Sequence, residues 1–384
     1  MKILGIETSC DETAVAVLEI KGKNNITVLS NIVSSQVKLH AKFGGVVPNL
    51  AAREHVKNIR RVFELALKTA GLNPPATAFS GAPPRAVAGG FKKEIDMIAV
   101  TRGPGLGPAL LVGLSFAKTL AWLYDKPVIG VNHLEGHIFS NWLPPIRKIN
   151  NYQLTINNAF CHIFPALNLI VSGGHTELVL MKDYGKYELV GETLDDAVGE
   201  AFDKVARLLG LEYPGGPAIS KIAKNGNSDK YPLPRPMLKL KNYNFSYSGL
   251  KTAVLYLIRD LKKDLGLSTL NLKQRADIAA SFQKSATEVL VIKTIRAAKQ
   301  YGVKSILLSG GVSANETLRT KLEKNAEQNG FKYFQPLMKY TGDNAAMIAL
   351  AGYFSYKAGK KPKKDLKWDL IDMDANLRLR NTPL

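Results

Sequence analysis

The chain has 384 residues, of which 46% are hydrophobic, so it is long enough to build two hydrophobic cores. Lys and Arg outnumber Asp and Glu by 52 to 32, and the net charge of +20 favours a polyanionic partner, nucleic acid first, over a composition that merely serves solubility. No apolar run is long enough for a membrane span, and the two cysteines, Cys10 and Cys161, lack metal-type spacing, so we expect a cytoplasmic protein without disulfides or a cleaved leader.

The chain opens with an apolar run that a short polar segment interrupts. Residues 3–20 predict a hairpin whose tip carries small hydroxyl residues and two carboxylates, those of Asp11 and Glu12. The hydroxyl groups are suited to hydrogen bonds with a phosphate, and the carboxylates of Asp11 and Glu12 are suited to position a cation or a water. A plain surface turn is the alternative interpretation.

Strand and helix patterns alternate along the next part of the chain. The predicted elements are strands at 26–37 and 95–100, a helix at 50–68 and an apolar helix that ends at Leu123. The glycine-rich turn at 101–108 lacks the spacing of a dinucleotide-binding loop, so a purely structural turn is at least as good an interpretation. Residues 73–93 and 144–167 show no periodicity, and we expect them to be flexible insertions.

The strongest chemical pattern is the segment Asn132-His133-Leu134-Glu135-Gly136-His137, which follows an apolar run. On a helix, two histidines four residues apart project from one face, so His133 and His137 can bind a single ion. Asp343 directly precedes another apolar helical pattern and is the candidate third ligand. Structural alternatives stay open, because Asn132 and Glu135 have the spacing of a capping box and Asp343 has the position of an N-cap.

A second strand-turn-strand pattern occupies residues 169–178. Gly173 and Gly174 at its tip permit positive backbone dihedrals and expose amides that can bind a phosphate. Two such hairpins, each opening one lobe with a phosphate-sized tip, are the layout of the actin-like ATPase and sugar-kinase superfamily. We therefore predict an α/β protein with this two-lobed fold.

Two later stretches offer polar groups to a bound nucleotide. A helix predicted from Thr193 carries Asp203, whose carboxylate is suited to ribose hydroxyls, although a solvated acid among basic neighbours is the ordinary explanation. A strand at 305–309 leads through a double glycine to Asn315, in a loop typical of the adenosine side of a nucleotide site.

Taken together, these residues closely resemble the bacterial tRNA threonylcarbamoyladenosine transferase family. The resemblance runs from Met1 to about Gly352, outside the two insertions, and rests on motifs at residues 7–13, 44–55, 101–113, 132–137, 172–177, 194–207, 246–253, 309–315 and 343–349. It implies an acyltransferase that moves the threonylcarbamoyl group from threonylcarbamoyl-AMP to the exocyclic amine of the adenosine 3′ of the anticodon. The implied acceptors are tRNAs that read codons beginning with adenine, and AMP is released.

The resemblance also implies the site. One divalent metal ion is expected on His133, His137 and Asp343, with Fe(II) favoured and Zn(II) as the alternative. Asp11 at the first hairpin tip is expected to aid orientation or proton removal. The adenylate-linked substrate is expected to lie against Ile170, Val171, Ser172, Gly173, Gly174, Asp203, Gly216 and Asn315.

The expected organisation is a first lobe at 1–131, a second lobe at 132–354 and a C-terminal segment, 355–384, that packs back on the first lobe. The resemblance implies tRNA as partner, an inactive paralogue as heterodimer partner, a small P-loop ATPase as helper, and no membrane. The family usually has Tyr and Glu where this chain has Phe43 and Asn49, which argues against an acid or base role at position 49.

Three rival functions are weaker. In zinc proteases the glutamate directly follows the first histidine, whereas Glu135 comes one place later. A small-molecule kinase of the same superfamily would use magnesium with its waters rather than paired histidines. A tRNA-binding scaffold without activity would bind tRNA but show no turnover.

Overall fold

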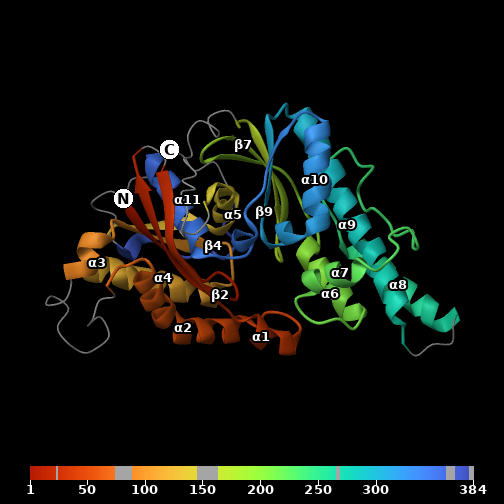
Figure 1. Ribbon diagram of the computed structural model, residues 1–384, viewed down its shortest axis with the longest axis horizontal. Coiled ribbons are helices and arrows are strands. Elements are labelled where there is room, and N and C mark those ends of the chain that lie inside the picture. The colour runs from red at the N-terminus through yellow and green to blue at the C-terminus, as the bar shows by residue number, and fades with distance from the viewer. Residues whose placement is uncertain (23–24, 74–88, 145–162, 265–268, 360–367, 380–384) are drawn as a thin grey trace. The chain divides into compact units, whose positions relative to one another are not determined.

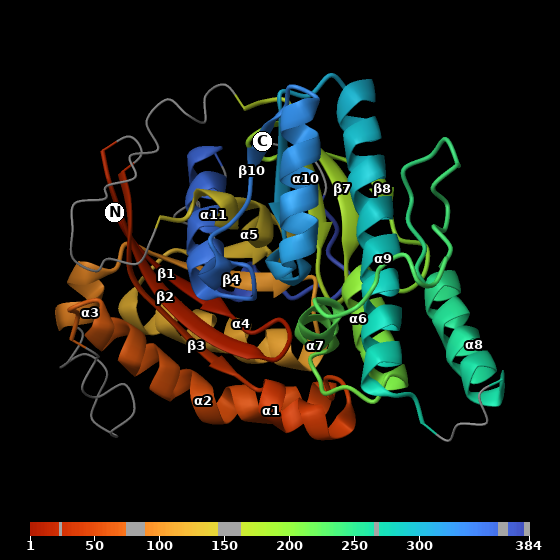
Figure 2. The same cartoon turned by 45° about the vertical axis from the view of Figure 1, so that its right-hand side comes forward.

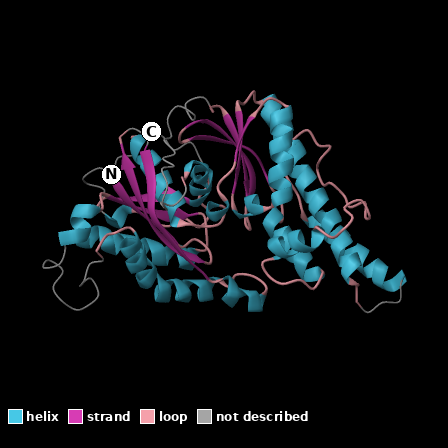
Figure 3. Ribbon diagram, in the orientation of Figure 1, coloured by secondary structure: helices cyan, strands magenta, loops and turns pink. Residues whose placement is uncertain are grey.

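The computed structural model describes residues 1–22, 25–73, 89–144, 163–264, 269–359 and 368–379. The chain divides into two compact units. Unit 1 comprises Met1–His162, Tyr184–Lys186 and Pro336–Leu384, and unit 2 comprises Ile163–Asp183 and Tyr187–Gln335. Both units contain a five-stranded sheet, drawn in magenta in Figure 3.

The sheet of unit 1 has the strand order β3-β2-β1-β4-β5. β1 pairs antiparallel with β2 and parallel with β4, and the two outer pairs continue these directions. The strands are β1 (Lys2–Glu7), β2 (Glu12–Lys21), β3 (Asn25–Ser35), β4 (Met97–Gly103) and β5 (Val128–Asn132). The predicted first hairpin is therefore confirmed, with Glu7 opposite Ala14.

Helices cover both faces of this sheet (Figures 1 and 2). The long helices α2 (Pro48–Thr69) and α4 (Gly107–Tyr124) bury the large apolar side chains of one face. On the other face, α11 (Ala345–Lys357) lies against β1. A Cβ atom on Gly5 would lie 2.1 Å from the carbonyl oxygen of Ala345, so the close approach of α11 requires glycine in β1.

Unit 2 repeats the strand order of unit 1, because its sheet runs β10-β9-β6-β7-β8. β6 pairs antiparallel with β7 and parallel with β9, as β1 does with its neighbours. The strands are β6 (Ala166–Val171), β7 (Thr176–Asp183), β8 (Lys186–Glu192), β9 (Ser305–Ser309) and β10 (Lys332–Phe334). This repeated mixed topology confirms the predicted α/β class and the actin-like ATPase and sugar-kinase fold.

The helices of unit 2 bury their apolar stripes in one hydrophobic core with one face of its sheet. They are α6 (Val198–Leu208), α7 (Gly215–Ala223), α8 (Ser248–Asp264), α9 (Leu272–Gln300) and α10 (Glu316–Gln328). The short helices within the described ranges are α1 (Val37–His40), α3 (Gly89–Glu94) and α5 (His133–Phe139). The 3-10 turns there are Ala41–Phe43, Ser140–Trp142, Gly311–Ala314, Met338–Tyr340 and Trp368–Leu370. Among the described residues, no helix has the length and apolar character needed to cross a bilayer.

Two expectations differ from the structure. The predicted lobe boundary at 131/132 separates α5 from unit 1, but α5 and the α11 helix pack against each other and belong with the first sheet. The helix predicted from Thr193 begins only at Val198, because residue 193 instead bridges to Phe245. Most of the two predicted insertions, residues 74–88 and 145–162, lies outside the described residues.

Candidate functional site

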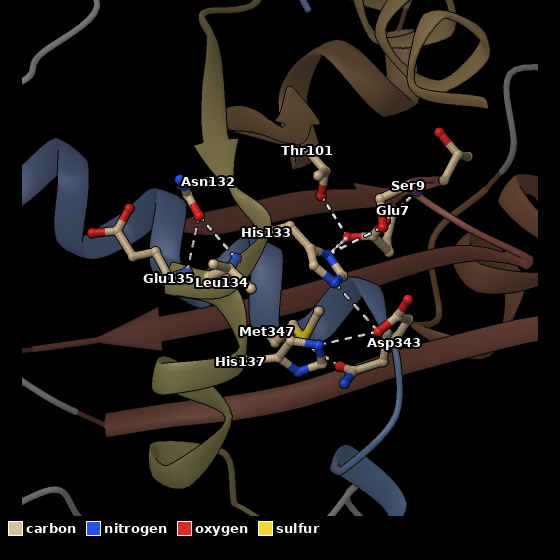
Figure 4. Close-up of polar contacts among 12 residues, drawn as sticks. Glu7, Ser9, Thr101, Asn132, His133, Leu134, Glu135, His137, Asp343 and Met347 are labelled. Atoms are coloured by element: carbon tan, nitrogen blue, oxygen red, sulfur yellow. Dashed lines mark hydrogen bonds and ion pairs between the residues drawn. The ribbon is translucent and has the colours of Figure 1, made fainter. Parts of the chain in front are cut away.

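The helix α5 begins directly where strand β5 ends. The side-chain oxygen of Asn132 accepts hydrogen bonds from the backbone N–H groups of Leu134, at 2.8 Å, and Glu135, at 3.3 Å. This N-cap starts the helix at His133, so His133 and His137 lie one turn apart with ring centroids separated by 4.7 Å. Both imidazoles are buried, and they face the same side (Figure 4).

Asp343 reaches the two histidines from the start of α11. The N-cap of that helix is the next residue, Asn344, whose side chain accepts from the N–H of Met347. The capping alternative for Asp343 is therefore wrong. Its Oδ1 atom lies 3.5 Å from Nε2 of His133 and 3.1 Å from Nε2 of His137.

These three side chains fit a metal ion. Atoms bound to one ion at about 2.1 Å lie roughly 3.0 to 3.4 Å apart, close to the two measured separations. The 3.1 Å contact between Nε2 of His137 and Asp343 does not have hydrogen-bond geometry, and among the described residues this buried nitrogen has no other partner, an arrangement that costs free energy unless something else binds there. Two imidazoles and a carboxylate suit Fe(II) or Zn(II). All three residues belong to unit 1.

A buried carboxylate supports the first histidine. Glu7 is the last residue of β1, and its Oε2 atom lies 3.0 Å from Nδ1 of His133. Burial raises the pKa of Glu7, but the neighbouring His133 lowers it to a net value below the ordinary one. Burial likewise lowers the pKa of His133, and the carboxylates of Asp343 and Glu7 outweigh it and raise this pKa to about 9. The sequence offered no pattern for Glu7 beyond its place at the end of a buried strand.

The hairpin tip brings two further carboxyl groups into this part of unit 1. Asp11 is buried, and its backbone carbonyl accepts a hydrogen bond from the N–H of Gln36. Burial, followed by the carboxylates of Asp343 and Asp11, raises the pKa of Glu12 well above its ordinary value. Asp11, Glu12 and Asp343 thus share one electrostatic environment, and the interpretation of the tip as a plain surface turn is wrong.

Glu135 lies on the opposite side of α5 from the imidazoles of the two candidate ligands. Its side chain points away from the imidazoles of His133 and His137 in Figure 4. A metalloprotease needs a carboxylate that activates a metal-bound water, and Glu135 cannot reach such a water from this side. The geometry therefore argues against a protease, as its sequence spacing also does.

Unit 2 gathers the glycine loops that were predicted to bind the nucleotide. The tip of the β6–β7 hairpin follows Val171, and the amides of Gly173 and Gly174 have no hydrogen-bond partner in the described part of the chain. A Cβ atom on either glycine would meet nothing within 4 Å, so the tip is open. Gly199 in α6 packs against the carbonyl of Ser172, and Gly310 packs against that of Val171, which brings the later loops beside this tip.

Asp203 and Gly216 are brought together at the start of α7. The Oδ1 atom of Asp203 accepts a hydrogen bond from the N–H of Gly215 at 2.7 Å. Burial raises the pKa of Asp203, although the amides of Gly215 and Gly216 oppose this shift. Asp203 is half-buried and bonded to these amides, so it is not simply a solvated acid among basic neighbours.

Asn315 has a structural task that the sequence did not reveal. Its Oδ1 atom accepts from the N–H of Leu318 and thereby caps α10, while its Nδ2 atom donates to Ser220 and to Gln283. Both amide hydrogens are therefore engaged, and only the acceptor side of Oδ1 is left for a ligand.

The comparisons with known proteins identify the family. A family model for tRNA N6-adenosine threonylcarbamoyltransferase matches residues 27–79 and 86–350. The chain belongs to this family. A protein of that name from Thermosipho africanus is 49% identical over 360 residues, which cover 94% of this chain and 96% of the relative. Its Bacillus subtilis counterpart is 46% identical, with 95% and 94% covered.

Solved structures support the fold alone. The T. kodakarensis HypF structure aligns with a TM-score of 0.53 at 16% identity, covering 95% of this chain and 48% of HypF. A full-length HypF with bound phosphate and nucleotide gives 0.52 at 15% identity, with 93% and 46% covered. This chain thus spans about half the length of HypF.

The two positions that were expected from the sequence to differ from the family, Phe43 and Asn49, lie near each other in sequence and are exposed. Phe43 ends a 3-10 turn with 60% of its surface exposed, and Asn49 lies in the first turn of α2. Neither residue belongs to the group that could hold a metal ion.

Proposed function

We propose that this protein transfers the threonylcarbamoyl group of threonylcarbamoyl-AMP to the exocyclic amine of the adenosine 3′ of the anticodon, in tRNAs that read codons beginning with adenine. The amine nitrogen forms a bond to the carbamoyl carbonyl carbon, the bond from that carbon to the phosphate oxygen breaks, and AMP leaves. The amine loses one proton. The observation that carries this proposal is the family match across nearly the whole chain.

His133, His137 and Asp343 would hold one divalent ion. The family resemblance favours Fe(II), with Zn(II) as the alternative, and the nitrogen and oxygen donor set accepts both. When bound, such an ion supplies Lewis-acid chemistry to a carbonyl or phosphoryl oxygen. Burial of the imidazoles supports a tightly held ion, since little water competes for the ligands.

The loops of unit 2 would bind the adenylate part of the donor. Gly173 and Gly174, whose amides have no hydrogen-bond partner among the described residues, would offer N–H donors to its phosphate. Ile170, Val171 and Ser172 lie directly before them and would line the same side of the donor site, although the N–H of Ser172 already donates to the carbonyl of His175. Asp203 and Gly216 would face the ribose, and the remaining acceptor side of Asn315 would contact an N–H or O–H of the adenosine. A fixed set of donors holds the leaving group in one orientation, which is how positioning lowers a barrier.

Asp11 would orient the acceptor amine or take up its proton. The adenine amine is a poor nucleophile, so placement matters more than basicity. The support for this role is the burial of Asp11 at the β1–β2 tip, within the electrostatic environment of Asp343. We expect Asp11→Ala to lower the single-turnover rate, and an unchanged rate would remove this role.

The partners follow from the same proposal. The net charge of +20 suits tRNA, and the family resemblance implies an inactive paralogue as heterodimer partner and a small P-loop ATPase as helper. The protein would act in the cytoplasm, where its tRNA substrates are found.

The decisive experiment uses labelled threonylcarbamoyl-AMP and unmodified tRNA, with and without the two helper proteins. We expect label in those tRNAs that read codons beginning with adenine, and equimolar AMP. A tRNA with guanosine in place of the target adenosine serves as the control and should stay unlabelled. Binding of tRNA without any label transfer, with helpers present, would contradict the proposal and favour a non-enzymatic scaffold.

A further inference from the structure

Glu7 is held in one orientation by two hydrogen bonds. The residue is fully buried at the end of β1. Its Oε1 atom accepts from the backbone N–H of Ser9 at 2.5 Å, and its Oε2 atom accepts from the hydroxyl of Thr101 at 2.6 Å. A backbone N–H can only donate, so the contact with Ser9 keeps Oε1 of Glu7 on the Ser9 side and leaves Oε2 on the side of Thr101.

The oxygen that faces His133 is Oε2, which lies 3.0 Å from Nδ1 of the ring. A carboxylate only accepts hydrogen bonds, so Nδ1 must carry the hydrogen. The lone pair of the neutral imidazole then lies on Nε2, the atom that is 3.5 Å from Oδ1 of Asp343. The hydroxyl of Ser9, 3.2 Å from the same Nδ1, can either donate or accept and does not decide between the tautomers.

We propose that Glu7 is a positioning residue that sets the tautomer of His133, so that Nε2 is the nitrogen presented to the metal. This inference rests on the metal site within the proposed function. Glu7 acts on one imidazole only, because Nδ1 of His137 has no hydrogen-bond partner in the described part of the chain. Carboxylates that accept from the second nitrogen of a metal-binding histidine commonly fix its ring in this way.

The substitution Glu7→Gln tests the proposal with almost no change in shape. The N–H of Ser9 keeps the amide carbonyl of the new side chain at the Oε1 position. The NH₂ group must then occupy the Oε2 position and donate to Nδ1 of His133. The ring hydrogen is then favoured on Nε2, so the ring must change tautomer, at a cost in free energy, before that nitrogen can bind a metal.

Thr101→Val is the matched control. It removes a hydrogen bond to the same Oε2 atom and is nearly isosteric, but it leaves a carboxylate as the acceptor for Nδ1. The control therefore disturbs the same buried cluster without reversing the direction of the hydrogen bond to His133.

The first measurement is the affinity for Zn(II) by calorimetric titration of the metal-free protein. We expect Glu7→Gln to weaken binding about 10- to 100-fold, the usual effect of losing such a partner, and Thr101→Val to change it by less than about threefold. Equal affinity of wild type and Glu7→Gln would overturn the inference while leaving the metal site intact. A wild-type protein that binds no Zn(II) or Fe(II) would overturn the metal site and this inference together.

The second measurement can be made on the wild type alone. Nitrogen-15 NMR of the metal-free protein at alkaline pH, where the imidazole is neutral, reports which ring nitrogen carries the hydrogen. We expect hydrogen on Nδ1 in the wild type and in Thr101→Val, and hydrogen on Nε2 in Glu7→Gln. Hydrogen on Nε2 in the wild type would refute the inference even if Glu7→Gln failed to fold.

Discussion

Lys293 is a buried side chain through which the stability of the folded protein should depend on pH. It lies in the middle of α9 and is fully buried, and its ammonium donates to the backbone carbonyls of Asn242 and Asn244. Burial, aided by the nearby charge of Arg296, lowers its pKa from 10.5 to about 8. No carboxylate pairs with it among the ion pairs of the described residues, so the charged form is costly in the folded state.

The pKa of Lys293 predicts a stability that rises at alkaline pH. Below about pH 8 the ammonium of Lys293 is charged in both the folded and the unfolded protein. Between about pH 8 and 10.5 the unfolded protein binds more protons than the folded protein, so the free energy of unfolding increases with pH. Relative to Lys293→Met, the wild type should gain on the order of 2–3 kcal/mol across this window. Urea unfolding of both proteins at pH 7.5, 9 and 10.5 measures the difference. A difference that does not vary with pH would contradict the predicted pKa.

For single residues, the sequence predicted the roles of side chains that belong to short motifs. It did not predict the roles of side chains that act through contacts distant in the sequence. His133 and His137 were predictable because their spacing on a helix is local. Glu7 was not, because its role depends on a partner far along the chain. The structural task of Asn315 was also hidden, since its contacts with Ser220 and Gln283 join separate helices.

The packing of α11 on β1 places Asp343. Because the Cβ atom of an alanine at position 5 would lie 2.1 Å from the backbone oxygen of Ala345, the first turn of α11 must move in Gly5→Ala. We expect a loss of about 1–3 kcal/mol in the free energy of unfolding and a weaker affinity for Zn(II), although Gly5 touches no metal ligand.

Gly45→Ala is the control for this prediction, because a Cβ atom there would meet nothing within 4 Å. Thermal unfolding and Zn(II) titration of both variants provide the measurements. If Gly5→Ala bound Zn(II) as tightly as Gly45→Ala, the position of α11 would not matter for the site.

Strands and helices were predictable where the residues of the segment itself determine its structure. Both hairpins and the strand at 305–309 follow directly from apolar runs bounded by glycine or polar turns. The start of α6 was missed because the segment after Thr193 is held by pairing with Phe245, and the N–H of Val198 donates to Thr176. Such contacts override the helical pattern of the segment itself.

At the scale of the whole molecule, the two-lobed α/β fold was predictable from the two hairpins, but the unit boundaries were not. Residues 336–384 return to unit 1 after the whole of unit 2. A boundary between consecutive residues, such as 131/132, cannot describe a chain that crosses between units more than once. The return is what brings Asp343 to the two histidines.

The charge of the whole molecule predicts salt-dependent tRNA binding. With a net charge of +20, binding should release counterions from the tRNA backbone, so the affinity should fall about tenfold or more between 50 and 200 mM salt. Filter binding of unmodified tRNA across this range gives the slope, and binding of AMP, with far fewer phosphates, is the comparison. A tRNA affinity that salt leaves unchanged would show that charge does not drive this interaction.

The central claim is that His133, His137 and Asp343 together hold one metal ion. The most direct test is the metal content of protein reconstituted without oxygen with Fe(II), or with Zn(II), for the wild type, His137→Ala, Asp343→Asn and the exposed control Asp372→Asn. The account predicts one ion per chain in the wild type and in Asp372→Asn, and far less than one in the other two. One ion per chain retained in both His137→Ala and Asp343→Asn would contradict it.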